Sequence, residues 1–540
     1  MTDTMAHGFN LTAMLPEIVL LIAACVVLLF DAVGSSRDDR ARNAARVAAN
    51  RRAAATATGP MRLSSGSGAA PELDEAMPAA PRAGFPIDRL ALIGLGATLL
   101  AVWIVSGQGV QYAFGELYVS DALAHVLKGC AIVATGAAIV YGRRYAIDRG
   151  IHKGELYALA LLALLGQMVM ISGANLLVLY LGLELMSLSL YAIAAIRRDS
   201  VPATEAAMKY FVLGALASGF LLYGMSMIYG ATGSLDIPDI VRKIGDGLVG
   251  QSVLVFGVVF LVAGIAFKFG AVPFHMWVPD VYQGTPTVAT ALIASGPKLA
   301  TFALAFRLLG DGLLSTSAQW QQMLIVLAVL SLGLGNLAAI AQTNIKRMLA
   351  YSAISQIGFV LLGILAAHGG NNPEVAAAGF SGAMFYAITY VLTTIGTFGL
   401  IQLIARQGHE AEQLDDFRGL ARRSPWLAGV MLAMMFSLTG IPPLVGFYAK
   451  LAVLQSVVEA GMVWLAVYAV MMSLIGAYYY LRVVKLMYFD EPVDEAPIAV
   501  SGDAKAVMSV NGALVLLLGV LPGPLMTLCL VAVSEALHLG

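Results

Sequence analysis

Apolar segments long enough to cross a lipid bilayer recur along almost the whole chain. About 20 mostly apolar residues in helical form span the hydrocarbon core, and the pattern predicts fourteen such spans, with an error of one. The expected spans are 11–31, 87–106, 120–142, 155–172, 175–196, 203–229, 251–271, 288–309, 321–341, 346–366, 378–404, 425–458 with an interruption, 463–487 and 507–535. This pattern predicts an all-α polytopic membrane protein.

The placement of basic residues gives these spans a direction. Lys and Arg gather in the links after the odd-numbered spans, and links of this kind usually lie in the cytoplasm. The basic links contain Arg37 to Arg62, Arg143, Arg144, Arg149, Lys153, Arg197, Arg198, Lys346, Arg347 and Arg406 to Arg423. Both termini are therefore expected in the periplasm of a bacterial inner membrane. The link 230–250 is an exception because it carries Arg242 and Lys243 beside aspartates, and we expect a short amphipathic helix outside the membrane there.

Residues 32–86 form a long stretch without apolar periodicity. The segment is rich in Arg, Ala, Gly, Ser and Pro, which predicts a disordered cytoplasmic loop. Its basic half could touch anionic lipid or a neighbouring protein, or the insertion could have no function. The residues before it lack the basic region and cleavage site of a signal peptide, so 1–31 should remain as the first span.

Two of the expected spans carry proline at membrane depth. The seventh contains Pro273 and Pro279, and the twelfth contains Pro442 and Pro443. Proline removes a backbone donor and clashes with the preceding turn, so both helices should be broken. Backbone left unpaired at that depth must be buried in protein or line a wet cavity. Because the broken spans are an odd number apart, two five-span repeats would be inverted relative to each other, as in secondary transporters.

These repeats predict the domain boundaries. The expected parts are the first span in 1–31, the insertion in 32–86, spans 2–3 in 87–154, the first repeat of spans 4–8 in 155–310, the second repeat of spans 9–13 in 311–490, and a linker with the last span in 491–540.

Composition agrees with a lipid environment and argues against several functions. The 540 residues are 59% hydrophobic and 12% charged, with mean hydropathy +0.81, whereas soluble domains carry about a quarter charged residues. The 32 basic and 33 acidic residues nearly cancel, which gives no electrostatic argument for nucleic acid. Cys25, Cys130 and Cys529 lie far apart, and no nucleotide-binding or zinc motif occurs. We therefore expect this chain to bind no NADH, cluster or metal.

Charged residues inside apolar spans are the strongest functional signal. An isolated charge at the bilayer centre costs roughly 2.5–3.5 kcal/mol on an insertion scale. Glu184 falls near the middle of span 5, and Lys209 lies about two turns into span 6, so we expect a coupled pair whose proton affinity depends on its separation. In the alternative interpretation, Lys209 reaches the cytoplasmic interface and bonds Glu205, one turn away.

Three further lysines lie in apolar surroundings. Lys268 ends the apolar half of span 7, Lys298 follows Gly296–Pro297 in mid-span, and Lys450 follows the break in span 12. About ten residues, or roughly 15 Å of helix, separate Lys298 from either end of its span, so its ammonium group should not reach the interface. Four lysines against one mid-membrane acid are too many for a purely structural ion-pair network. We expect desolvated lysines, linked by water, that pass protons.

Several other polar residues stay ambiguous. His275, after the first break, could relay protons or cap a helix end. Tyr386 and Tyr390 on span 11, with neighbouring threonines, could hold waters or bond across helices. The favoured interpretation of the outer end of span 3 is a solvated interface formed by Asp121, His125 and Lys128.

These motifs resemble the antiporter-like subunits of respiratory complex I. The segments that carry the resemblance are AMKYFVLGALASGFLLYG, AFKFGAVPFHMWVPDVYQGTPTVATALIASGPKLATF, NIKRMLAYSAISQIGFVLLG and GLARRSPWLAGVMLAMMFSLTGIPPLVGFYAK. The resemblance is strong over about residues 155–490, and the insertion 32–86 departs from the family pattern. Lysine at position 298, where the L and M members would carry histidine, favours the N branch of the family.

The resemblance implies a role for each buried charge. Glu184 and Lys209 would form the ion pair, Lys268 would be the central proton carrier, Lys298 would connect the half-channels, and Lys450 would lead to the exit.

The resemblance also implies a translocase that couples NADH–quinone electron transfer to proton pumping. This chain would do no redox chemistry, and NADH, FMN, iron–sulfur clusters and quinone would bind to partner subunits. Its neighbours in the lipid bilayer would be M and K type subunits, with L, A, J and H types further along the membrane arm.

Two other functions stay open. The chain could belong to a multi-subunit cation/proton antiporter or a membrane-bound hydrogenase, which share the fold, or it could be a non-conducting scaffold. Neighbouring genes for iron–sulfur and flavin subunits would favour the oxidoreductase, whereas full pumping by a Lys268→Ala variant would leave only the scaffold.

Overall fold

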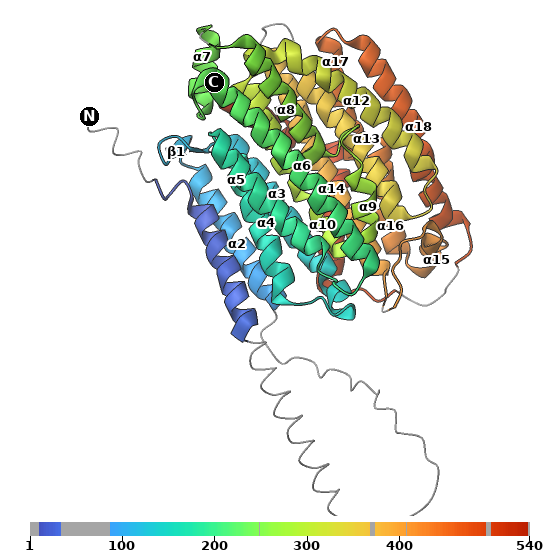
Figure 1. The fold of residues 1–540 in the computed structure, drawn as a ribbon. Coiled ribbons are helices and arrows are strands. Elements are labelled where there is room, and N and C mark those ends of the chain that lie inside the picture. The colour runs from blue at the N-terminus through green and yellow to red at the C-terminus, as the bar shows by residue number, and fades with distance from the viewer. Residues whose placement is uncertain are drawn as a thin grey trace, which may run out of the picture.

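The computed structural model describes residues 10–33, 87–247, 249–367, 373–406, 408–492 and 498–537. Within these ranges the chain is a bundle of helices that lie side by side (Figure 1). A short antiparallel hairpin of β1 (Gln111–Ala113) and β2 (Tyr118–Ser120) accompanies them. The all-α fold is confirmed. The first helix runs to Val33, and the rest of the predicted disordered loop 32–86 lies outside the described residues.

The helices fall into two groups along the chain. The first group comprises the first helix (Leu15–Val33), α2 (Ile87–Ser106), α3 (Ala122–Asp148), α4 (Gly154–Ser172), α5 (Leu176–Ala194), α6 (Val201–Thr232), α7 (Ile237–Gly245), α8 (Gln251–Phe269), α9 (Trp277–Gly284), α10 (Thr287–Ala294), α11 (Gly296–Ala305), the π-helix η1 (Phe306–Gly312) and the 3₁₀ helix η2 (Leu314–Thr316). The second group comprises α12 (Ser317–Ile340), α13 (Ile345–Ala366), α14 (Pro373–Ile404), η3 (Leu414–Phe417), α15 (Leu420–Arg423), α16 (Pro425–Thr439), α17 (Val445–Glu459), α18 (Val463–Phe489), α19 (Gly502–Val520) and α20 (Gly523–Ala536).

The number of membrane spans agrees with the sequence pattern. Within the described residues, thirteen helices are long and apolar enough to cross a membrane. The shorter α16 and α17 form the interrupted span expected at 425–458, which brings the total to the fourteen expected. The last expected span, 507–535, is not continuous, because α19 ends before Pro522 and α20 starts after it. Proline cannot continue a helix in mid-course, which explains this unexpected break.

The helix breaks predicted at the proline-containing spans are present. Gly270 caps α8 with φ +76°, and Gly440 caps α16 with φ +90°. Glycine adopts this left-handed conformation without steric cost, so the chain leaves each helix axis just before its proline. A further break at Ser295 divides the span expected at 288–309 into α10 and α11. The boundaries of the two inverted repeats stay a prediction.

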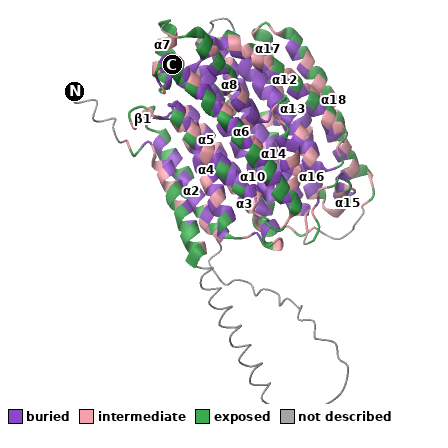
Figure 2. Ribbon diagram, viewed as in Figure 1, coloured by how far each residue is buried: buried purple, intermediate pink, exposed green. Residues whose placement is uncertain are grey.

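Small residues bring neighbouring helices close together in both halves. A Cβ atom at Gly166 of α4 would lie 2.3 Å from the main-chain nitrogen of Met186 in α5. Similarly, a Cβ atom at Gly335 of α12 would lie 2.7 Å from the main-chain nitrogen of Ser355 in α13. Close packing of this kind holds helices together in lipid, where burial of apolar surface gives little drive. The central helices α10, α11 and α13 are almost wholly buried, while edge helices such as α2 expose apolar side chains (Figure 2).

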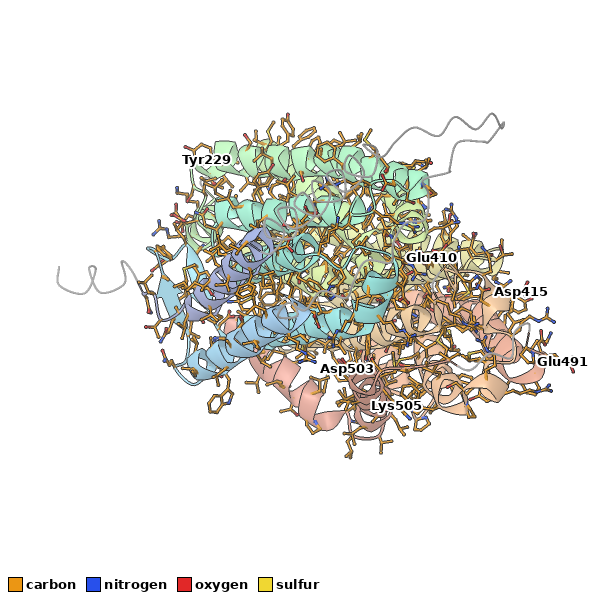
Figure 3. All side chains as sticks on the ribbon, turned by 90° about the horizontal axis from the view of Figure 1, so that it is seen from below. Tyr229, Glu410, Asp415, Glu491, Asp503 and Lys505 are labelled. Carbon is orange, nitrogen blue, oxygen red and sulfur yellow. The ribbon has the colours of Figure 1, made fainter. Side chains whose placement is uncertain are left out.

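The helix ends form two opposite faces. The basic face contains the end of α3, the starts of α6 and α13, the loop around Glu410 and the start of α19, and Figure 3 shows it from below. The hairpin face contains β1, β2, α7 and the end of α20 (Figure 1). The helix predicted in the link 230–250 is α7, which buries Ile237 and Ile240 and pairs Asp239 with Arg242 and Lys243.

Candidate functional site

Lys298 lies at the start of α11, directly after the break at Ser295, and is only 2% exposed. Its Nζ donates a hydrogen bond to the main-chain oxygen of Phe269 at 2.6 Å and lies 5.6 Å from the centre of the Trp277 ring. Phe269 is the last residue of α8, so its carbonyl has no partner within the helix. The lysine therefore satisfies a carbonyl that the broken helix leaves free.

Lys450 has the same relation to the second broken helix. Its Nζ donates to the main-chain oxygens of Leu438 at 3.0 Å and Thr439 at 2.8 Å, and to Oγ of Ser473 at 2.7 Å. Leu438 and Thr439 end α16. A cation is electrostatically favoured at the carboxyl end of a helix, where unpaired carbonyls carry negative partial charge. Both halves of the chain thus place a lysine ammonium group against the end of a broken helix.

Lys268 links the first broken helix to the acidic residue of the membrane interior. It lies in the last turn of α8, and its Nζ donates to Oγ of Ser187 on α5 at 2.9 Å. Glu184 lies almost one turn earlier on α5, and its charge acts on the ammonium group of Lys268. Oε1 of Glu184 is buried and has no hydrogen-bond partner. The structure therefore brings Glu184 together with Lys268.

The expected ion pair between Glu184 and Lys209 is not formed. Nζ of Lys209 instead lies 2.8 Å from Glu205 and 2.8 Å from Asp280, and the side chain is 43% exposed. Lys209 lies about two turns from the start of α6, so its long side chain reaches the basic face, where carboxylates can be solvated. The alternative with Glu205 as partner matches this geometry.

Asp280 connects Lys209 to the start of α13. Its other oxygen accepts a hydrogen bond from Nη1 of Arg347 at 2.8 Å. Burial alone would raise the pKa of Asp280, but the two cations lower it below its usual range. Asp280 is therefore a carboxylate held between two cations at the basic face.

Tyr386 belongs to a hydrogen-bonded chain that ends at the Lys450 site. Its hydroxyl donates to Oε1 of Gln356, and Nε2 of Gln356 donates to the main-chain oxygen of Leu438 at 2.9 Å. The same oxygen accepts from Lys450. Tyr386 and Tyr390 line a cavity of about 20 Å³ beside this chain, which is enough space for about one water molecule. The arrangement suits a proton relay between α14 and the second break.

His275 is not part of this arrangement. It is half-buried in the turn before α9, and its Nδ1 is buried without a hydrogen-bond partner. Among the contacts of the described residues, none joins its ring to one of the buried lysines. Its role as a relay stays a prediction.

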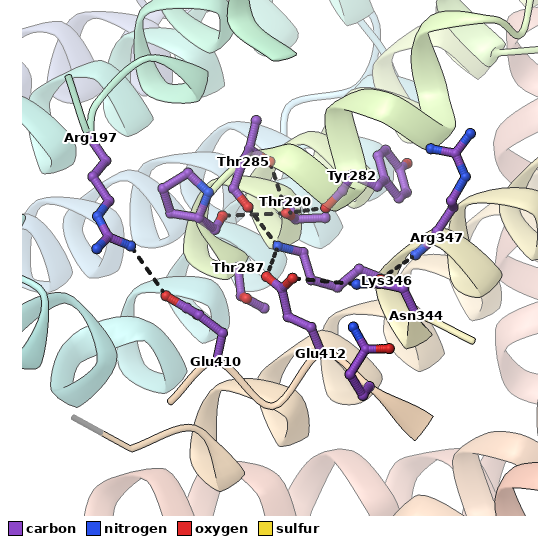
Figure 4. A network of polar contacts seen from close by, with 12 residues as sticks. Arg197, Tyr282, Thr285, Thr287, Thr290, Asn344, Lys346, Arg347, Glu410 and Glu412 are labelled. Atoms are coloured by element: carbon purple, nitrogen blue, oxygen red, sulfur yellow. Dashed lines mark hydrogen bonds and ion pairs between the residues drawn. The ribbon is translucent and has the colours of Figure 1, made fainter. Parts of the chain in front are cut away.

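Lys346 is a buried cation that sequence reasoning treated only as part of a basic link. It is fully buried, and its Nζ donates to the main-chain oxygen of Thr285 at 2.6 Å and to Glu412 at 2.9 Å (Figure 4). Thr285 in turn shares a hydrogen bond of 2.9 Å with Thr290 of α10. No clear signal in the sequence predicted this burial, because Lys346 is followed directly by Arg347 and comes two residues after Asn344 at the start of α13. Lys346 ties the joint between α9 and α10 to the loop that carries Glu412.

The interpretation of the outer end of α3 as a solvated interface is wrong. Lys128 is 1% exposed, and its Nζ lies 2.7 Å from Glu17 and 2.7 Å from the Tyr118 hydroxyl. Asp121 is equally buried and pairs with Arg307 at 2.6 Å, and His125 shares a hydrogen bond with Ser120. The first helix and the β hairpin cover this end of α3, which separate segments of sequence could not reveal.

The fold and the buried lysines define an antiporter-like membrane subunit. The chain belongs to the family described as NADH:quinone oxidoreductase/Mrp antiporter, TM, whose model matches residues 173–476. It is 59% identical over 431 residues to NADH-quinone oxidoreductase subunit N of Herminiimonas arsenicoxydans, covering 79% of this chain and 87% of that protein. It is also 59% identical to the subunit N of Thiobacillus denitrificans, covering 83% and 91% of the two chains. The expected resemblance to the N branch is confirmed.

Solved structures show the same fold. A chain of respiratory complex I from Thermus thermophilus with bound Aureothin is 33% identical, with TM-score 0.69 over 82% of this chain and 93% of that one. A chain of the Mrp complex from Dietzia sp. is 22% identical, with TM-score 0.72 over 83% and 92% of the two chains, and is alike in fold.

Proposed function

We propose that this chain is the N-type proton-translocating subunit of an NADH–quinone oxidoreductase, and that Glu184, Lys268, Lys298 and Lys450 carry the protons. The observation that supports this most is the contact of Lys298 and Lys450 with the carboxyl ends of two broken helices deep in the bundle. Neutral polar groups would satisfy those carbonyls at lower desolvation cost than a charged amine. The use of lysine at these two helix ends therefore supports a function that needs a group able to release a proton.

Protonation and helix geometry are coupled at each break. Burial disfavours a charged amine, while the carbonyl dipoles at the helix end stabilise it. A small movement of the end of α8 relative to Lys298 therefore changes how firmly the proton is held. The negative charge of Glu184 likewise stabilises the protonated form of Lys268. A change in the charge or position of Glu184 would therefore alter how firmly Lys268, next to the first break, holds its proton.

Lys209 is proposed as the mobile member of this system. In the present structure it is held by Glu205 and Asp280 at the basic face. An exchange of partner from Asp280 to Glu184 would remove negative influence from Lys268 and favour release of its proton. Tyr386, with Tyr390 beside it, is proposed to relay protons towards Lys450 through Gln356 and the main-chain oxygen of Leu438.

The basic face is proposed to face the cytoplasm, with both chain ends in the periplasm. Arg143, Arg149, Arg197 and Arg347 support this orientation through the positive-inside rule. As in the complex I structure that the chain resembles, partner subunits would surround it in the membrane arm. M and K type subunits are proposed as direct neighbours, L, A, J and H types as more distant partners, and the redox cofactors as bound by other subunits.

A second candidate is a subunit of a cation/proton antiporter assembly, because the family description includes Mrp antiporters and the Mrp chain shares the fold. Purification of the chain from its native membrane separates the two. Copurifying flavin and iron–sulfur subunits support the oxidoreductase, whereas copurification with small membrane subunits alone supports the antiporter.

The proton path is tested by Lys268→Ala in membrane vesicles energised with NADH. We expect normal assembly, with proton translocation reduced about tenfold or more, because the residue between Glu184 and the first break is lost. Lys243→Ala on α7, outside the membrane, is the matched control and should pump normally. Normal pumping by Lys268→Ala would leave a scaffold as the remaining function.

A further inference from the structure

The short helix α9 lies between the first broken helix and the joint with α10. Its eight residues, Trp277–Gly284, rise about 12 Å along the helix axis. Non-helical residues flank it on both sides, so α9 is a short rigid unit between two flexible points. Whatever holds one end of α9 therefore also sets the position of the other end.

A buried charge holds the carboxyl end of α9. Thr285 is the C-cap residue, and its main-chain oxygen accepts a hydrogen bond of 2.6 Å from Nζ of Lys346. The Lys346 side chain is fully buried, and Oε1 of Glu412 lies 2.9 Å from its Nζ (Figure 4). The side chain of Glu412 is 25% exposed. Lys346 and Glu412, here called the clamp, therefore join the end of α9 to a carboxylate that solvent reaches at the basic face.

The middle of α9 is held from two sides. Asp280 pairs with Nζ of Lys209 on α6 and with Nη1 of Arg347 on α13, each at 2.8 Å. Arg347 directly follows Lys346 and also donates to Oε1 of Gln283 at 3.1 Å. The start of α13 thus holds α9 both at its end and in its middle. A shift of α9 relative to α6 would change the distance between Asp280 and Lys209.

The amino end of α9 lies beside the first break. Nζ of Lys298 is 5.6 Å from the centre of the Trp277 ring, and Nε1 of Trp277 donates to the main-chain oxygen of Phe267 at 3.1 Å. The same ring stacks on Tyr210 of α6, with the ring centres 4.7 Å apart. A shift of α9 would therefore also change the surroundings of the Lys298 ammonium group.

We propose that Lys346 and Glu412 are positioning residues of the proton path, and that α9 transmits the state of the clamp to Lys209 and Lys298. This inference rests on the proposed function, because the position of α9 matters only if those lysines take part in proton transfer. When Glu412 loses its charge or moves with its loop, the buried ammonium group of Lys346 loses its counter-charge. Its hold on α9 then changes, and Trp277 shifts relative to Lys298.

Substitutions at position 346 separate positioning from proton transfer. Lys346→Met leaves the end of α9 without its buried donor, so the protons translocated per NADH oxidised in membrane vesicles should fall at least about threefold. Lys346→Arg keeps a cation that can donate to the same carbonyl but does not release its proton, so it should pump within about twofold of wild type. Lys485→Met removes an exposed, ion-paired lysine that does not contact α9, and this matched control should pump normally.

A double-mutant cycle tests whether α9 transmits the effect. Trp277→Phe alters the amino end of α9, whereas Lys346→Met alters the hold on its carboxyl end. Changes about 12 Å apart usually act independently. If α9 moves as one unit, the two effects on pumping should be non-additive in free energy, while Lys485→Met and Trp277→Phe should be additive. Glu412→Gln, which leaves Lys346 in place, takes its role in the cycle if a variant at position 346 does not assemble.

Three results would overturn the clamp. Normal pumping by Lys346→Met would show that the hold on α9 is not needed, and independent effects in the cycle would show that α9 does not transmit them. A loss of pumping in Lys346→Arg as large as in Lys346→Met would show that Lys346 carries protons itself. Normal pumping by Lys268→Ala would instead overturn the proposed function, whatever the clamp variants do.

Discussion

The two broken helices hold their lysines with different partners. At the first break, Lys298 reaches across from the next span to one carbonyl of α8, and Lys268 of α8 bonds Ser187, almost one turn from Glu184 on α5. At the second, Lys450 comes from the same interrupted span and contacts two carbonyls and Ser473. No carboxylate among the described residues pairs with Lys450 within 4.0 Å. The first break thus has a counter-charge close by, whereas the second has neutral ligands.

This difference predicts which kind of substitution should impair each break. A cation near an acid responds to the movement or neutralisation of that acid, since the interaction extends beyond contact distance. A cation held by dipoles depends instead on the short contacts of its ligands. We therefore expect loss of charge to matter most at the first break and ligand geometry to matter most at the second.

The largest expected effect is that of Glu184→Gln. The change keeps the shape of the side chain but removes the negative charge that acts on Lys268, so proton translocation should fall about tenfold or more. Proton uptake by NADH-energised vesicles measures this, with complex abundance checked in the same membranes. Glu155→Gln, which alters a 51% exposed carboxylate at the basic face, is the control. Similar pumping in both variants would remove Glu184 from the proton path.

Lys298→Met should also lower stability. The main-chain oxygen of Phe269 would lose its buried donor, which costs about 1–3 kcal/mol. Thermal unfolding of the purified complex should therefore occur at lower temperature than in the surface control Lys243→Met. An unchanged unfolding temperature would mean that the end of α8 finds another donor.

Ser473→Ala should give a smaller effect at the second break. Lys450 keeps both carbonyl contacts, so we expect a loss of about 1 kcal/mol or less and a fall in pumping of less than about threefold. If Ser473→Ala abolished pumping while Lys450→Met did not, the neutral-ligand account of this break would be wrong.

How far the sequence predicts this molecule depends on whether the signal is local. Pro273 and Pro442 predicted both breaks correctly, because the steric effect of proline acts within one turn. Lys298 was expected in the interior from the length of apolar sequence around it, and it is buried there, whereas Lys450 is half-buried. Such features need no knowledge of the neighbouring helices.

Partners across the bundle could not be predicted in the same way. Lys209 was assigned to Glu184, but Asp280, seventy-one positions along the chain from Lys209, is its partner. Lys128 was expected in solvent, yet Glu17 of the first helix covers it. In both cases helices far apart in sequence decide the environment of the charge. Pro522 was a local signal that was overlooked, and it divides the last span.

The smallest expected effect lies outside the membrane, at Glu410. Burial raises the pKa of this carboxyl, but the hydrogen bond and charge of Arg149 lower it by more. The net pKa therefore lies below its usual value of 4.5. Its stabilising contact is therefore complete above the pKa of the unfolded chain and is lost as the pH falls through the lower folded pKa. Glu410→Gln should destabilise the complex by about 1 kcal/mol or less at neutral pH. The difference in unfolding temperature from wild type should shrink as the pH falls through the lowered folded pKa and vanish in stronger acid, and a difference that persists there would contradict this assignment.

Proton translocation by Lys298→Arg tests the central claim most directly. Arginine keeps the positive charge and can still donate to the main-chain oxygen of Phe269, but it does not release its proton at any pH that the protein meets. If Lys298 transfers protons, the variant should assemble in normal amounts and yet translocate protons about tenfold more slowly, or not at all, in NADH-energised vesicles. Assembly with wild-type pumping would show that position 298 needs only a cation to cap α8, and would contradict the account.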